Sequence, residues 1–106
     1  MDDGSRIRAR NLGIGFTGNA GKFNSITDVP GIEVGFVTRI EGSEIRTGVT
    51  AILPRGKKGV GEPCAAAVLS FNGNGELTGS HWIEESGSLA TPILITNTHA
   101  VGPVHQ

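Results

Sequence analysis

The sequence lacks several residue types on which small proteins often depend. Its 106 residues include no tyrosine and only one tryptophan, one methionine and one cysteine. A single cysteine excludes a disulfide framework, and Cys64 lies in the apolar run CAAAVLSF, where a lone thiol is usually a small buried hydrophobic residue rather than a nucleophile. Without tyrosine, the chain offers no phenolic hydroxyl group that could stabilise an oxyanion.

Long apolar runs and clustered charge are also scarce. No run approaches the roughly 20 apolar residues of a membrane span, and the charged N-terminus has no signal-peptide core. We therefore expect a soluble, cytoplasmic chain with no membrane partner. The net charge is −1, and the nine lysines and arginines are scattered apart from two short groups at 6–10 and 55–58, so a nucleic-acid partner is not expected.

Glycine and proline, by contrast, are abundant. Seventeen glycines and five prolines separate short runs rich in Val, Ile and Leu, as in a loop-rich folded domain. A chain of this length forms one domain at most, with a small core. Residues 11–31 have a glycine or proline every few positions and should wrap over a surface. Within them, Asn24–Asp28 is typical of a capped turn, so Ser25 is not expected to be a nucleophile.

Four segments have the patterns of β-strands. Residues 32–40 alternate between apolar and mostly polar positions, and residues 49–53 form a second apolar run that stops at Pro54. The polar residues 41–44 between them predict an antiparallel hairpin. Residues 65–71 and 92–96 are apolar at consecutive positions, which predicts strands covered on both faces.

One short helix is predicted before the last strand. Thr78 or Ser80 can cap it, residues 81–85 form its body, and Gly87 can end it in the left-handed conformation. Since so short a helix is unstable alone, Trp82 should hold it by packing against the sheet. Pro103 is typical of a helix start, so the sequence stops within an element and is interpreted as a fragment.

Two sets of residues suggest simple ligand sites, but neither has the spacing of a known motif. The loop NGNG at 72–75 resembles a phosphate cradle, yet it lacks the spacing of known phosphate motifs and is better explained as a turn. His81, His99 and Glu84 could bind a metal ion or small ligand, but no two histidines have the close spacing of a helical zinc motif. We therefore expect no metal and no cofactor.

Polar residues around the helix and the last strand are candidates for the frame of a binding site. A glutamate near the end of the helix is either solvated or placed to recognise a cationic group such as a substrate's free amine. The residues that follow the last strand are in a position from which loop side chains commonly line a site. The candidates are Asn72, Asn74, Glu76, Trp82, Glu84, Asn97, Thr98 and His99.

Four blocks of the sequence, at 8–35, 46–57, 71–87 and 92–104, together resemble the DmpA-like aminopeptidase family, which includes L-aminopeptidase/D-esterases and β-peptidyl aminopeptidases. The resemblance implies an α/β fold, here part of an αββα sandwich in β-β-β-α-β order behind the glycine-rich wrap. It also implies a precursor that cuts itself into two chains and exposes a serine nucleophile at the new N-terminus. The family's catalytic residues match segments beyond Gln106, so the resemblance places no catalytic residue in this chain.

Residues 1–106 are therefore expected to be a single partial domain, the N-terminal portion of the larger processed chain of a serine aminopeptidase. Such an enzyme hydrolyses N-terminal residues of small peptides, amides or esters that carry a free amine. Its implied partners are the remainder of its own precursor and, at full length, further copies of itself. The alternative is a non-catalytic binding or assembly module that keeps only half of the sandwich, and the chain alone is not expected to be active.

Overall fold

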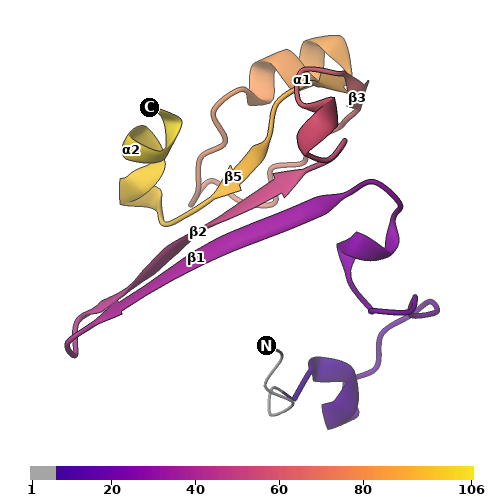
Figure 1. The fold of residues 1–106 in the computed structure, drawn as a ribbon, viewed down its shortest axis with the longest axis vertical. Coiled ribbons are helices and arrows are strands. Elements are labelled where there is room, and N and C mark those ends of the chain that lie inside the picture. Colours follow the sequence, from indigo (N-terminus) through magenta and orange to yellow (C-terminus); the bar gives the residue numbers. More distant parts are fainter. Residues whose placement is uncertain (1–6) are drawn as a thin grey trace.

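A long β-hairpin dominates the structure, a computed structural model that describes residues 7–106 (Figure 1). Strand β1 (Glu33–Glu41) pairs antiparallel with β2 (Ile45–Leu53) in an unbroken register from Glu33–Leu53 to Glu41–Ile45. The predicted hairpin and its turn are confirmed. Strand β2 begins at Ile45 rather than at the predicted Val49, because the cross-strand pairing continues to the turn.

The remaining elements are short and lie near one end of the hairpin or N-terminal to it. The strands are β3 (Cys64–Ala65), β4 (Ser88–Leu89) and β5 (Ile93–Ile95), and the α-helices are α1 (Ser80–Ser86) and α2 (Val101–His105). The 3₁₀ helices of the described residues are η1 (Ala9–Leu12), η2 (Ile26–Asp28), η3 (Lys57–Gly59) and η4 (Thr98–Ala100). The predicted mixed α/β class is confirmed.

Strand pairing within residues 7–106 gives two antiparallel sheets. Strand β5, predicted at 92–96, pairs with the end of β2 so that Ile93 lies opposite Ile52, which gives the order β1-β2-β5. Strands β3 and β4 form a separate two-stranded ribbon in which Cys64 faces Leu89. The Cys64 thiol is half-buried and donates to the Leu89 carbonyl at 3.5 Å.

The predicted strand at 65–71 is wrong over most of its length. Pairing ends at Ala65, and after the Ala66 N–H group donates to the Gly87 carbonyl the chain continues without regular structure. Leu69 is 84% exposed and Phe71 is 93% exposed. An apolar run becomes a central strand only where neighbouring strands and covering side chains are available. Residues 7–106 provide neither for this segment.

Helix α1 ends as predicted but begins differently. Gly87 adopts the left-handed conformation with φ 63°, and its N–H group donates to the Ile83 carbonyl at 2.8 Å. The predicted side-chain cap is absent, because the Thr78 hydroxyl donates instead to the Glu76 carboxylate at 2.6 Å and Ser80 is already the first helical residue. Helix α2 likewise begins two residues before Pro103, since η4 leads directly into it.

The N-terminal segment stands to one side of the sheet instead of wrapping over it (Figure 1). Almost all of residues 7–31 are exposed. Their internal structure is nevertheless specific, because the Arg8 guanidinium donates to the carbonyls of Phe23 and Asn24. The glycine-rich segment therefore has its own hydrogen-bonded structure and lacks a surface to cover.

The described residues have no hydrophobic core. None of their hydrophobic residues is fully buried. The chain exposes 9028 Å², whereas a compact monomer of this mass exposes about 5,600 Å². Its radius of gyration is 16.1 Å, against about 13 Å for a compact domain of this length. The fold thus leaves apolar surface that a stable protein would cover.

No helix among residues 7–106 is long and apolar enough to cross a membrane.

Candidate site frame

Asn97 is the candidate residue that the fold positions most firmly. Directly after β5, the Thr96 hydroxyl donates to the Gly48 carbonyl at 3.0 Å, and the Asn97 amide donates to the Thr47 hydroxyl at 2.9 Å. These two bonds tie the end of the last strand to the middle of β2, about 50 residues earlier in sequence. The Asn97 side chain is therefore fixed against β2, and its place in the wall of a site stays a prediction.

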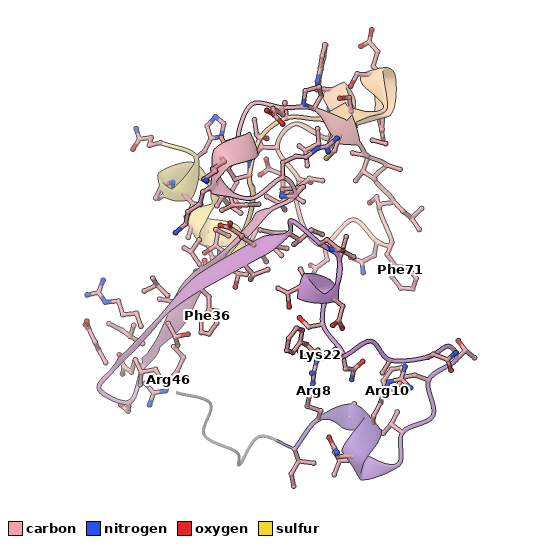
Figure 2. All side chains as sticks on the ribbon, turned by 45° about the vertical axis from the view of Figure 1, so that its right-hand side comes forward. Arg8, Arg10, Lys22, Phe36, Arg46 and Phe71 are labelled. Atoms are coloured by element: carbon pink, nitrogen blue, oxygen red, sulfur yellow. The ribbon has the colours of Figure 1, made fainter. Side chains whose placement is uncertain are left out.

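The surface beside Asn97 is an open groove of about 490 Å³ along the hairpin. Its lining is mainly apolar and hydroxyl-bearing, with one guanidinium and one amide: Phe36, Val37, Thr38, Ile40, Arg46, Thr47, Gly48, Val49, Thr50 and Asn97. Figure 2 shows Phe36 and Arg46 on this hairpin. The lining contains no carboxylate, imidazole or thiol, so it offers no general base. These lining residues therefore cannot perform acyl transfer by themselves.

The other candidates on the last segment and in the loop at 72–78 do not join this groove lining. Thr98 and His99 are exposed in η4. Asn72 and Asn74 form a local turn in which the Asn72 side chain accepts from the Asn74 N–H group at 3.0 Å. This geometry confirms the turn explanation of the NGNG loop. Glu76 is exposed and accepts from Thr78 within the same loop.

Helix α1 presents its candidates to solvent. Trp82 is 66% exposed, so the prediction that it anchors the helix against the sheet is wrong for this chain. The reason is that α1 lies beside β4 of the small β3–β4 ribbon, where Ile83 is its half-buried apolar side chain. His81 and Glu84 are also exposed. No group of three or more His, Cys, Asp or Glu side chains in residues 7–106 is placed to hold a metal ion.

The turn at 23–28 is built as predicted. The Ser25 hydroxyl accepts from the Thr27 N–H group at 3.4 Å, and the Asp28 carboxylate accepts from the N–H groups of Ser25 at 3.1 Å and Phe23 at 2.8 Å. These donors, with a smaller contribution from the nearby Arg8 cation, lower the pKa of Asp28 below its usual value. Ser25 is therefore a capping residue.

Sequence reasoning missed the contribution of β2 to the groove. Arg46, Thr47 and Gly48 fell outside the strand predicted at 49–53. A glycine within an otherwise alternating strand was the available signal, because such a glycine often marks a close approach of another backbone. Here the Gly48 carbonyl accepts a hydrogen bond from the Thr96 hydroxyl, and this bond fixes the end of β5.

Comparisons with known proteins match this arrangement to one enzyme family. The model of Peptidase family S58 matches residues 24–106. A solved β-aminopeptidase from Burkholderia sp. superposes with a TM-score of 0.82 at 52% identity over 92% of this chain and 29% of that one. The PH0078 protein from Pyrococcus horikoshii OT3 superposes with a TM-score of 0.81 at 39% identity, over 91% of this chain and 30% of that one. The chain therefore shares the α/β fold of these proteins and belongs to Peptidase family S58.

Curated relatives lead to the same family. The β-peptidyl aminopeptidase BapA of Sphingosinicella microcystinivorans is 49% identical over 93% of this chain, and that of Sphingosinicella xenopeptidilytica is 46% identical over 93%. The chain covers only 27% and 26% of these two relatives. It thus spans about a quarter of the length of the curated relatives that it matches.

Proposed function

We propose that this chain is the N-terminal part of a self-processing serine aminopeptidase. The whole enzyme hydrolyses N-terminal residues from small peptides, amides or esters through an acyl-enzyme, and its nucleophile lies outside residues 1–106. The chain supplies the frame of the site, with the hairpin groove and Asn97 as its best-defined parts. The observation that carries the proposal is high identity over nearly the whole chain but only a quarter of each curated relative.

The chemistry of the described residues supports this division of labour. Acyl transfer needs an activated nucleophile and preorganised donors for the developing oxyanion. The hairpin groove beside Asn97 has no general base in its lining. The one serine considered as a nucleophile, Ser25, caps a turn. The catalytic groups are thus proposed to come from the remainder of the precursor.

The exposed apolar surface supports the same partner. The chain exposes about 3,400 Å² more total surface than a compact monomer of its mass. This excess is larger than the area that a standard protein interface buries. The proposed partner is the rest of the same precursor, which would cover the β1–β2–β5 sheet and the run at 66–71. A cytoplasmic location, a homo-oligomeric parent and a substrate with a free amine remain predictions.

A segment exchange tests the proposal. The matching 107-residue segment of the Sphingosinicella microcystinivorans enzyme is replaced by this chain, and self-cleavage is followed on gels while turnover is followed with a β-aminoacyl-p-nitroanilide. The hybrid should process itself and turn over, whereas the same enzyme without the segment and this chain alone should not. A hybrid that melts cooperatively but neither cleaves itself nor turns over would contradict the proposal.

The alternative function, a binding or assembly module, predicts different results for the isolated chain and for the hybrid. It requires residues 1–106 to be a complete, stable fold without further cover. A monodisperse monomer with a sharp, cooperative melt, together with an inactive hybrid, would favour the module. Robust hydrolysis by the chain alone would contradict both functions, because each places the catalytic groups elsewhere.

A further inference from the structure

Strand β1 is a long sheet edge with an open side. It pairs with β2 over nine residues without a break in register, and the sheet order β1-β2-β5 leaves its other side without a strand among residues 7–106. The strand contains no proline, and Phe36 and Val37 are each 73% exposed. An exposed edge of this length is a template for pairing with another strand.

The backbone groups that face the open edge can be identified. The Val37 carbonyl oxygen lies against Gly48 of β2, so the backbone groups of Val37 point into the hairpin. In an antiparallel strand the next residues in each direction point the opposite way. The N–H and C=O groups of Phe36 and Thr38 therefore face outward, as do those of Val34 and Ile40 at the same spacing.

We propose that the β1 edge binds the β1 edge of a second copy of this chain, antiparallel and about a two-fold axis at Phe36. In this register Glu33 of each copy lies opposite Arg39 of the other, so two oppositely charged pairs form. At the centre the two Phe36 side chains are cross-strand neighbours, and Val34 lies opposite Thr38. Opposite charges and aromatic pairs at directly opposed positions stabilise antiparallel strands.

The neighbouring symmetric registers are less favourable. Centring the axis on Val37 places Glu33 opposite Glu41 twice, which repels. Centring it on Thr38 places Glu41 opposite Gly35 and leaves the charged residues without oppositely charged partners. The sequence of β1 is thus self-complementary in charge around Phe36.

Within one copy, Arg39 already donates to Glu41 at 2.7 and 3.1 Å. Both side chains are more than half exposed, at 63% and 52%, so this ion pair is weak and Arg39 can be shared with Glu33 of the second copy. One pair of strands buries less surface than a standard interface, so the association should be concentration-dependent. This inference concerns the chain itself and does not rest on the proposed catalytic function.

Sedimentation equilibrium over a wide concentration range, at low salt, tests the charge pairing. Glu33→Arg or Arg39→Glu alone should weaken dimerisation by about tenfold or more, and the double exchange should restore it because the opposed charges are merely swapped. Glu44→Arg is the matched control: it makes the same charge change in the hairpin loop, outside the paired residues, and should leave dimerisation unchanged. Circular dichroism checks that each variant keeps its strand content.

Thr38→Pro tests the backbone pairing separately. It removes an outward N–H group while the β1–β2 bonds of Val37 remain, as proline permits on an edge strand, and it should abolish dimerisation. A chain that stays monomeric at every concentration, or dimers that tolerate Thr38→Pro and the single charge reversals, would overturn the proposal.

Cross-linking fixes the register. In a Cys64→Ser background, Phe36→Cys should give a disulfide-linked dimer on oxidation, because the central residues of a two-fold pair lie within bridging distance. Thr38→Cys should not, because the two copies of Thr38 are separated by about 13 Å along the strand direction. Efficient cross-linking at Thr38 but not at Phe36 would reject this register.

Discussion

The carbonyl oxygen of Val37 occupies the space that a β-carbon on Gly48 would need. The two residues lie on facing strands of the hairpin, where Gly48 is opposite Thr38. Glycine is therefore required at this point of β2, since any side chain would meet rigid backbone rather than a flexible neighbour. Gly35 on β1 is different, because a β-carbon there has nothing within 4 Å.

Gly48→Ala should loosen the hairpin, whereas Gly35→Ala should not. The first substitution forces the two backbones apart and should cost about 1–3 kcal/mol, as overpacking does. The second should be neutral or slightly stabilising, because glycine within a strand costs about 0.5–1 kcal/mol relative to alanine. Hydrogen exchange of the amides of 45–53 measures both effects. Equal protection in the two variants would contradict the steric argument.

The turn at 23–28 should lose order in acid. Asp28 has a lowered pKa in the folded turn because the N–H groups of Phe23 and Ser25 donate to its carboxylate. A lowered folded pKa means that the stabilisation is complete above the ordinary value of 3.8 and is lost as the pH falls through the folded value. The amide chemical shifts of Phe23 and Ser25 should therefore titrate below pH 3.8.

Asp28→Asn provides the control for this titration. The amide keeps an acceptor oxygen but has no charge to lose, so the acid transition of the turn should disappear. Glu44→Gln, in the hairpin loop, should leave the transition in place. An unchanged transition in Asp28→Asn would assign the pH dependence to another group.

The bond between Asn97 and Thr47 should contribute measurably to the position of the last strand. Thr47→Val and Asn97→Ala each remove one partner, and a double-mutant cycle in the active hybrid should give a coupling of about 0.5–1.5 kcal/mol in denaturant unfolding. Turnover should fall in both single variants if Asn97 frames the site. Additive effects on stability would show that the bond is not maintained in the complete enzyme.

The substitution Trp82→Ala should change stability little in the chain alone and strongly in the hybrid. In the chain alone it is 66% exposed, so Trp82→Ala should change stability by no more than about 0.5 kcal/mol. In the hybrid, where the missing segments are proposed to cover the helix, the same substitution should cost about 3–5 kcal/mol. Equal, small effects in both proteins would mean that this tryptophan stays at the surface.

Ser25→Ala in the hybrid should leave self-cleavage and turnover intact. The Ser25 hydroxyl caps η2, so its loss should cost about 1 kcal/mol of stability. Gel analysis of processing and a p-nitroanilide assay measure the two activities. Loss of both at unchanged stability would make this serine catalytic after all.

Local features of the fold were predictable because their causes lie within a few residues. The hairpin follows from alternation and a polar turn, the end of α1 follows from Gly87, and the turn at Ser25 follows from its capping pattern. Each depends on contacts that residues 7–106 contain. The same holds for Asn97, whose place after a strand was visible in the sequence.

Features that depend on distant contacts were not predictable from the chain. The run at 65–71 has the pattern of a covered strand, yet Phe71 points away from the ribbon into solvent (Figure 2). Trp82 likewise has the character of an anchor and lies exposed. These side chains have the patterns of buried residues, and the described chain has nothing to bury them. The register of Thr96 and Asn97 on β2 was also hidden, because it joins positions about 50 residues apart.

The exposed strands also bear on how such an enzyme would be synthesised. If this chain is the first translated part of a longer polypeptide, the open β1 edge leaves the ribosome early, and the run that ends at Phe71 does so long before the segments that would cover it. At about 5–20 residues per second, the remaining three quarters of a relative's length take tens of seconds to translate. During that interval, neighbouring nascent chains on one messenger RNA would be able to pair through their open β1 edges. Holding by chaperones would then determine the yield of active enzyme.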